Sequence, residues 1–416
     1  MLRRPAPESL WADGDWRRYW LSRVVSYFGG VVTYVAAPVL VYALSGSALL
    51  TGIATATEGL PYLMFGLIAG ALSDRVDRRR LMVSCDLVNA AVLATVPVAA
   101  VLGRLTIAQV LVVGFTSSTA FVFFDAANFG AVPALVGRER IGLANSTVWG
   151  TTQIFDILVP GAVGVAVAVI SPSSLYWVDA FTFLASAALL RGIRRSMSGD
   201  RSDVPHRLRD DVLTGLRWLW AHPTLRPLTI FGTATTFAFG GVIGQLVPFA
   251  DQVVGIRTGD TRLGAVFAAF SIGGLVGTLL HRWLKPFAPV RISLVALSFA
   301  SLFLLALPWP RDWRATLVIV FLIGVVNLVS VINVITYRQE ETPEEMQGRV
   351  NTTARMLSWG LGSPIGAFVC GVVAGRHGSQ AGVLVAALVM TAATALAWRS
   401  SLGRVPARRP SVDQVA

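Results

Sequence analysis

The sequence contains little charge, little cysteine and little histidine, and each shortage excludes a class of protein. Charged residues make up 14% of the 416 residues and hydrophobic residues 54%, whereas a typical soluble domain is roughly one-quarter charged. Both cysteines, Cys85 and Cys370, lie in apolar segments, which argues against a disulfide framework. The four histidines show no metal-ligand spacing, and no Gly-x-x-x-x-Gly-Lys-Ser/Thr loop is present to bind ATP. We therefore expect neither an enzyme nor a bound metal or cofactor.

Long apolar runs dominate the rest of the sequence. A helix needs about 20 apolar residues to cross a bilayer, and the chain contains twelve such runs joined mostly by short loops. No cleavable signal peptide precedes the first run, which we interpret as a retained span. The predicted spans are residues 18–43, 50–72, 81–102, 107–130, 142–169, 174–192, 228–250, 262–281, 289–308, 314–337, 347–374 and 380–399. The sequence thus predicts an all-α membrane protein.

One long connection divides these spans into two groups of six. We expect an N-terminal six-helix bundle at residues 1–192, a cytoplasmic linker at 193–227, and a C-terminal six-helix bundle with a cytoplasmic tail at 228–416. Apolar residues at helical spacing over 206–221 predict an amphipathic helix on the membrane surface. A solvated linker is the alternative for that segment.

The two halves resemble each other. The pattern Glu-x-x-Gly-x-x-Asn-Ser/Thr begins at Glu139 and again at Glu345, 206 residues later. Residues 277–282 echo residues 70–75 at nearly the same offset, with His281 in the place of an aspartate. Pseudo-symmetric halves of six helices, with a binding site at their interface, are typical of secondary transporters.

The positive charges indicate an orientation. The net charge is +12, but the basic residues fall in alternate loops, so we expect a lipid bilayer as partner and no nucleic acid. With the N-terminus inside, 29 of the 35 basic residues lie on the cytoplasmic side, which places both termini in the cytoplasm. Arginine outnumbers lysine 34 to 1, a bias typical of a GC-rich bacterial source, so we expect the bacterial plasma membrane.

The densest charge cluster lies between the second and third spans. Residues 70–80 read Gly-Ala-Leu-Ser-Asp-Arg-Val-Asp-Arg-Arg-Arg, and such a cluster cannot lie in hydrocarbon. It resembles the loop between helices 2 and 3 of the major facilitator superfamily, Gly-x-Leu-Ala-Asp-Arg-x-Gly-Arg-Arg. Further segments at 26–29, 124–127, 145–153, 177–180 and 342–350 resemble a branch of bacterial efflux permeases that includes enterobactin exporters and macrolide efflux proteins.

The resemblance implies a gate at this loop. Asp74 would face the positive end of a helix dipole near Gly348, and Arg78 would pair with Asp125. Such contacts would hold the cytoplasmic sides of the two halves together and stabilise an outward-facing state. The alternative is that these charges only fix topology. The implied gating residues are Gly70, Asp74, Arg75, Arg78, Asp125, Gly348 and Arg349.

Three acids within apolar runs are candidates for proton coupling or substrate contact. Asp156 lies near the middle of the fifth span, Glu58 in the outer half of the second, and Asp179 near the start of the sixth. A buried carboxyl group can exist in its neutral form, which a proton carrier needs. The alternatives are a hydrogen-bonded structural acid or an acid that lines a wet cavity. For Asp179 we favour a structural role, because it lies near a helix end.

Basic side chains are scarce at mid-depth, which disfavours organic phosphates and dicarboxylates as substrates. The remaining cavity candidates are aromatic and amide side chains, which suit an amphiphilic molecule. Aromatic residues at helical spacing also serve simply in packing. These candidates are Tyr27, Tyr34, Phe121, Phe237, Gln245, Asn327 and Asn333.

Together these features predict a secondary active transporter, a monomer that exports an amphiphilic small molecule such as a drug, antibiotic or siderophore in exchange for protons. One alternative is an importer or uniporter of a small metabolite on the same fold. Another is a membrane scaffold or sensor that no longer transports; the acids at membrane depth argue against it, because charges there are unfavourable unless they are used.

Overall fold

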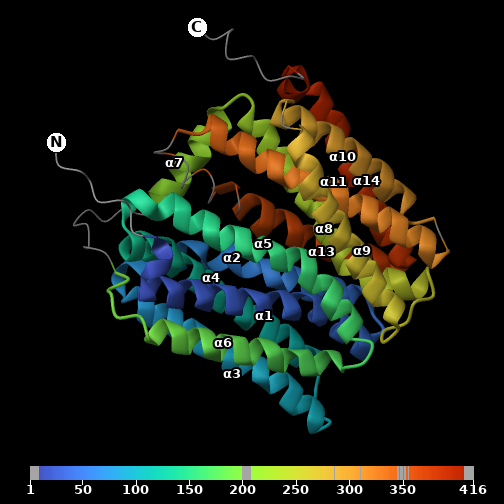
Figure 1. The fold of residues 1–416 in the computed structure, drawn as a ribbon. Helices are drawn as coiled ribbons and strands as arrows, with labels where there is room; N and C mark the ends of the chain where they lie inside the picture. Colours follow the sequence, from blue (N-terminus) through green and yellow to red (C-terminus); the bar gives the residue numbers. More distant parts are fainter. Residues whose placement is uncertain are drawn as a thin grey trace. The chain divides into compact units, whose positions relative to one another are not determined.

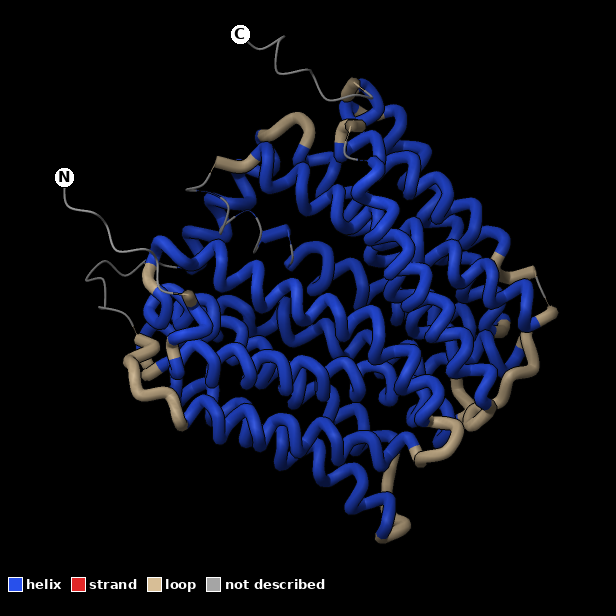
Figure 2. Tube along the Cα trace, viewed as in Figure 1, coloured by secondary structure: helices blue, strands red, loops and turns tan. Residues whose placement is uncertain are grey.

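The computed structural model describes residues 9–198, 208–284, 286–309, 311–343, 346, 350, 353–354 and 356–406. Over these residues the chain consists of helices joined by short loops, without a β-strand (Figure 2). Within the described part of the chain, eleven helices are long and apolar enough to cross a membrane. With α2, which has 28 residues, they account for the twelve predicted spans. The predicted all-α membrane fold is therefore confirmed.

The helices follow the order that the apolar runs predict (Figure 1). The first six are α1 (Gly14–Ser45), α2 (Ala48–Arg75), α3 (Arg78–Val101), α4 (Ile107–Val136), α5 (Ile141–Ala166) and α6 (Leu175–Arg191). After the short α7 (Leu208–Ala221) come α8 (Leu225–Gln252), α9 (Thr261–Leu284), α10 (Pro289–Ala306) and α11 (Trp313–Glu341). A π-helix at Met356–Gly362 then continues into α13 (Ser363–His377), which is followed by α14 (Ser379–Arg399).

Local signals in the sequence set the helix ends. The Asp77 side chain accepts a hydrogen bond from the backbone N–H of Arg80 at 2.8 Å and caps the start of α3. Thr106 caps α4 in the same way through Gln109 N–H, at 3.2 Å. Each cap satisfies a backbone donor that the first helical turn leaves unpaired. Gly137 follows α4 with a φ of 79°, a conformation that side chains other than hydrogen disfavour.

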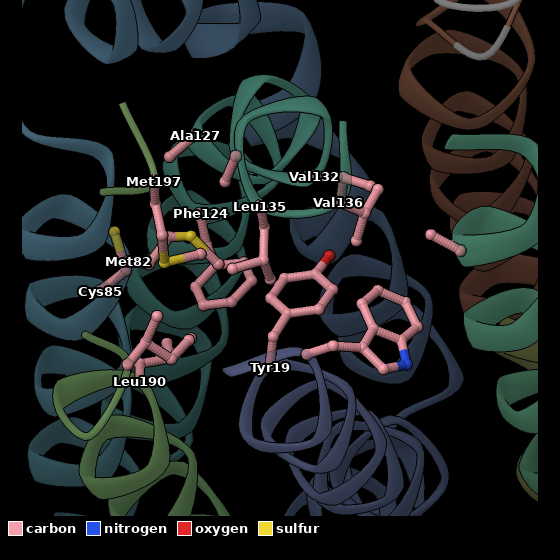
Figure 3. Close-up of a cluster of buried hydrophobic side chains, with 14 of the residues drawn as sticks. Tyr19, Met82, Cys85, Phe124, Ala127, Val132, Leu135, Val136, Leu190 and Met197 are labelled. Atoms are coloured by element: carbon pink, nitrogen blue, oxygen red, sulfur yellow. The ribbon is translucent and has the colours of Figure 1, made fainter. Parts of the chain in front are cut away.

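The chain forms two compact units, and the first contains Met1–Tyr34, Met64–Val159 and Ser173–Leu208. In this unit α3 packs along both α6 and α4. A cluster of buried side chains from α1, α3, α4 and the segment after α6 forms its core. Figure 3 shows Met82, Cys85 and Met197 gathered beside Phe124, with Tyr19 adjacent. Because lipid surrounds such helices, close packing rather than water exclusion stabilises the unit.

The second unit contains Val35–Leu63, Pro160–Pro172 and Arg209–Ala416. In this unit α11 packs against α9 and α10, and α8 packs against α13 and α14. The later part of α1, the first part of α2 and the end of α5 belong to this unit as well. Segments from both halves of the sequence therefore form one compact body.

The amphipathic helix predicted at 206–221 is α7; residues 206 and 207 lie outside the described residues. Leu219 is fully buried and packs against Val350 and Ala354, whereas Trp220 is exposed. One face of α7 is thus covered by protein. Its position on a membrane surface stays a prediction.

Candidate functional site

A pair of polar side chains joins α1 to α5 inside the first unit. The Tyr27 hydroxyl donates to the carboxylate of Asp156, and both carboxylate oxygens lie 2.8 Å from it. Trp20 Nε1 donates to Thr151 Oγ1 at 3.3 Å one to two turns away on the same two helices. The rings of Phe28 and Phe155 pack edge to face beside the pair, with centroids 5.6 Å apart. We refer to these contacts of Trp20, Tyr27 and Phe28 with α5 as the α1–α5 seam. The seam holds Asp156 in a fixed place among mostly apolar groups.

The Tyr27–Asp156 pair brings together two residues that the sequence put in different groups. Asp156 was an acid candidate and Tyr27 a cavity candidate. A carboxylate that accepts from a phenol can bind and release a proton while Tyr27 holds its position. Charged groups at membrane depth are rare and usually functional. This pair is therefore the best-formed candidate site among the described residues.

Asp179 is placed differently. Thr33 Oγ1 donates to one carboxylate oxygen at 2.6 Å, and Thr182 Oγ1 lies 3.3 Å from the other. A Cβ atom on Gly29 would collide with Asp179 and Thr182, so glycine lets α1 approach α6 closely. Asp179 is 1% exposed. Asp179 therefore accepts hydrogen bonds from α1 and from its own helix, and its structural role stays a prediction.

Glu58 lies in the second unit, on α2, and has no hydrogen-bond or ion-pair partner among the described residues. The next residue, Gly59, packs against Pro364 and the carbonyl oxygen of Trp359. Trp359 belongs to the π-helix, whose Ser358 carbonyl accepts from Thr236 Oγ1 at 2.9 Å. Single π-helical turns are frequent at functional sites. Glu58 therefore neighbours a second irregular feature of the membrane helices.

The predicted gating loop is described only in part. Arg78 Nη1 donates to the Gly130 carbonyl oxygen on α4 at 3.1 Å, and its backbone N–H donates to Ser198 Oγ at 3.2 Å. A side chain on Gly130 would collide with the Arg78 guanidinium. The side chain of Arg78, at the start of α3, therefore contacts α4, the helix that carries Asp125. The pairing of these two side chains stays a prediction.

The other gating residues stay untested. Gly70 is buried within α2 and Arg75 is exposed at its end. Asp74 lies in the last turn of α2, but its side chain falls outside the described part of the structure. Gly348 and Arg349 also lie outside the described residues. A contact between Asp74 and the segment near Gly348 therefore remains a prediction.

The remaining cavity candidates have unequal surroundings. Gln245 and Asn333 are almost fully buried, at 0% and 1% exposure. Asn333 Nδ2 donates to the Val329 carbonyl at 2.8 Å and lies 3.2 Å from His281 Nδ1. Tyr34 is exposed, whereas Phe121, Phe237 and Asn327 are half-buried. A role in substrate contact stays a prediction for all of them.

Sequence reasoning missed a polar contact in the second unit. Tyr42, near the end of α1, donates to Asp251 Oδ2 at the end of α8, at 2.7 Å. Gln245 Nε2 donates to the Ala48 carbonyl at 3.2 Å. The only signal for Tyr42–Asp251 was an acid directly after the seventh apolar run, which does not identify a partner 209 positions away.

Glycines accompany these contacts. A Cβ atom on Gly52 would lie 2.6 Å from the Ala367 carbonyl and 2.8 Å from Gly371 Cα. One on Gly164 would lie 2.6 Å from Gly264 Cα. The backbones of α2 and α13, and of α5 and α9, thus touch where both helices lack side chains. Gly52, Gly164, Gly264 and Gly371 therefore serve in close packing.

Comparisons with known proteins agree with this architecture. The family model of the Major Facilitator Superfamily matches residues 19–367. Multidrug efflux pump Tap of Mycolicibacterium fortuitum is 30% identical over 378 residues, which cover 87% of this chain and 90% of that protein. Enterobactin exporter EntS of Salmonella typhi is 24% identical over 365 residues, which cover 85% of this chain and 84% of that protein.

A solved structure shares the fold. A bacterial homologue of the human lysosomal transporter Spinster, in an inward-facing and unoccupied conformation, superposes with a TM-score of 0.75. The match covers 95% of this chain and 98% of that one, at 13% sequence identity. At this identity the similarity concerns the fold alone.

Proposed function

This chain belongs to the Major Facilitator Superfamily, and on that premise we propose that it is a proton-coupled exporter of amphiphilic small molecules. Relatives that match most of its length are named a multidrug efflux pump and an enterobactin exporter, which supports drugs, antibiotics or siderophores as the substrate class. The observation that carries the proton coupling is the Tyr27–Asp156 pair at membrane depth.

The orientation in the membrane follows from the arginines. The excess of basic residues on one side supports cytoplasmic termini, so the α1–α2 and α3–α4 loops face the exterior. A single cysteine in place of Arg104, which is exposed, should react with an impermeant maleimide in intact cells. One in place of Ser196, also exposed, should react only after permeabilisation. Both native cysteines are buried, so we expect little background labelling of them by the maleimide. The opposite labelling pattern would reverse the orientation.

In this orientation the second unit supports closure on the extracellular side. Tyr42–Asp251, Gln245–Ala48 and the glycine contacts join segments from both halves of the sequence there. Alternating access requires such contacts to break when the transporter opens outward. We propose that the predicted cytoplasmic gate around Asp74 and Arg78 forms when these extracellular contacts break. The exporter would then release its substrate outside.

Asp156 is our first choice for the proton-carrying residue. It lies on the α1–α5 seam, and Tyr27 supplies a hydrogen bond that can follow the change in its protonation. Glu58, which stands beside the π-helix region without a partner among the described residues, is the second choice. Charge at either position is unfavourable in hydrocarbon, so each is suited to cycle between an ionised and a neutral form.

The test is accumulation of a panel of dyes and antibiotics in cells that lack their own pumps, with and without a protonophore. We expect wild-type protein to lower accumulation, the protonophore to reverse this, and Asp156→Asn to abolish it at normal expression. Glu58→Gln is the matched control. Export that survives Asp156→Asn but not Glu58→Gln would transfer the coupling role to Glu58. Export that ignores the protonophore would overturn proton coupling, and energy-dependent uptake would favour the importer.

A further inference from the structure

A second group of polar side chains lies in the first unit and is unused by the proposed function. Its members are on α1, α3 and α6, and all are almost completely buried. We refer to them as the interior polar cluster. They are Arg23, Asp86, Asn89 and Asp179, with exposures of 8%, 0%, 1% and 1%.

Two acceptor atoms in this cluster lack a donor. Ser186 Oγ on α6 donates to Asp86 Oδ2 at 2.6 Å, but Asp86 Oδ1 is buried without a hydrogen-bond partner among the described residues. Asn89 Oδ1 is also buried without one. Residues three apart on a helix lie on the same face, so Asp86 and Asn89 are neighbours. Unpaired acceptors are strongly unfavourable within a membrane protein, and here two occur together.

The charges of the cluster do not balance. Asp86 lies within electrostatic range of both Arg23 and Asp179. Arg23 forms no ion pair among the described residues; its guanidinium lies 4.7 Å from the centre of the Phe124 ring, and its Nε has no partner. With both carboxyl groups ionised, one arginine leaves a net charge of −1 in a buried space. A buried charge needs compensation.

We propose that the interior polar cluster binds one monovalent cation, a proton or a sodium ion, between the Asp86 carboxyl group and the Asn89 amide oxygen. A proton on Asp86 Oδ1 would be donated toward Asn89 Oδ1, whereas a sodium ion would be coordinated by both oxygens. Either cation brings the cluster to neutrality. The positive charge of Arg23 opposes either cation, so the attraction comes from the two carboxyl groups and the two unpaired acceptor atoms. The other ionisable groups nearby are Asp179 on α6, Tyr19 on α1, Cys85 on α3 and Asp125 on α4.

This site shares no residue with the Tyr27–Asp156 pair, and the proposal does not depend on the proposed export. It makes its own prediction about the stability of the purified protein. A native state that binds a proton which the unfolded chain releases becomes more stable as the pH falls. A native state that binds sodium becomes more stable as sodium is added. Neither effect requires a transported substrate.

The experiment is thermal unfolding of the full-length protein in detergent, followed by tryptophan fluorescence. The conditions are about pH 5 to about pH 9, in sodium chloride or in N-methylglucamine chloride. The variants are Asp86→Asn, which fixes a neutral side chain, and Asn89→Leu, which removes the second acceptor without adding a polar group. Asp260→Asn, outside the membrane helices, is the control.

For a proton we expect the wild-type Tm to rise by about 3 °C or more as the pH falls, in either salt. That rise should shrink in Asp86→Asn and Asn89→Leu and persist in Asp260→Asn. For sodium we expect a saturable rise at alkaline pH that N-methylglucamine does not give and that both cluster variants lose. If both variants keep the wild-type responses, or if Asn89→Leu merely stabilises the protein at every pH, the cluster binds no cation and the proposal is wrong. Should Asp86→Asn not fold, Asn89→Leu decides alone.

Discussion

Tyr27 on α1 donates its phenolic hydrogen to the Asp156 carboxylate on α5, equidistant from both oxygens at 2.8 Å. The two residues are 129 positions apart in the sequence. Their contact links the helix that begins the first half to the helix whose first turns contain most of the Glu-x-x-Gly-x-x-Asn segment. Under the proposed function, this hydrogen bond would couple movement of α1 against α5 to a change in the charge of Asp156.

Tyr27→Phe should reduce proton-driven export by about tenfold while leaving insertion unchanged. A hydrogen bond to a charged group contributes about 1.5–3 kcal/mol, and removing the hydroxyl leaves Asp156 without that partner. The measurement is initial efflux of a dye from energised cells at equal expression. Phe28→Leu, on the same helix, is the control and should retain most of the activity. Equal rates for Tyr27→Phe and wild type would exclude a role for this bond in coupling.

Tyr42→Phe should shift the protein toward the outward-open state. The Tyr42–Asp251 hydrogen bond at 2.7 Å joins α1 to α8 in the second unit. Its loss should destabilise the state that is closed on the extracellular side by about 1–3 kcal/mol. Spin labels in the α1–α2 and α8–α9 loops would report the change by double electron–electron resonance. We expect the population of molecules with a long distance between the two spin labels to grow severalfold. An unchanged distance distribution would show that the glycine contacts alone maintain closure.

Gly164→Val should block transport by preventing close approach of α5 to α9. The Cβ atom would lie 2.6 Å from Gly264 Cα, which is backbone and cannot rotate away. Gly150→Val, on the same helix, is the matched control because nothing lies within 4 Å of a Cβ atom there. We expect at least tenfold slower dye efflux for Gly164→Val than for Gly150→Val. Similar rates for the two variants would show that α5 and α9 tolerate separation.

Asp260→Asn should change stability equally at all pH values between about pH 5 and about pH 9. The Arg262 guanidinium donates to Asp260 Oδ2 at 2.6 and 2.9 Å, and these bonds hold the pKa of the Asp260 carboxyl below its ordinary value. A carboxyl whose pKa is lowered on folding stabilises the native state above its unfolded pKa, and this contribution is lost only as the pH falls through the lower, folded value. Thermal unfolding of the variant against wild type checks this. A difference that varies between pH 5 and pH 9 would contradict it.

The sequence by itself determined the helices, their order and the family. Twelve apolar runs of spanning length must form helices, because a backbone in hydrocarbon has to satisfy its own hydrogen bonds. Asp77 and Gly137 fix helix ends through local geometry, which neighbouring residues alone specify. The loop at residues 70–80 carried the resemblance to the Major Facilitator Superfamily, and the family match confirms it. That family consists of transporters, so the prediction of a protein that is not an enzyme is also confirmed.

The partners of the buried polar groups were decided only by tertiary structure. Apolar runs give the depth of Asp156 but not that Tyr27 would face it, since helix rotation depends on packing against neighbouring helices. The sequence places Asp86 and Asn89 within an apolar run. Only the packing of α3 on α6 shows that an acceptor atom of each lacks a hydrogen-bond donor among the described residues. Tyr42 and Asp251 are 209 positions apart. Such pairings arise from the three-dimensional assembly of whole helices, and no local pattern encodes them.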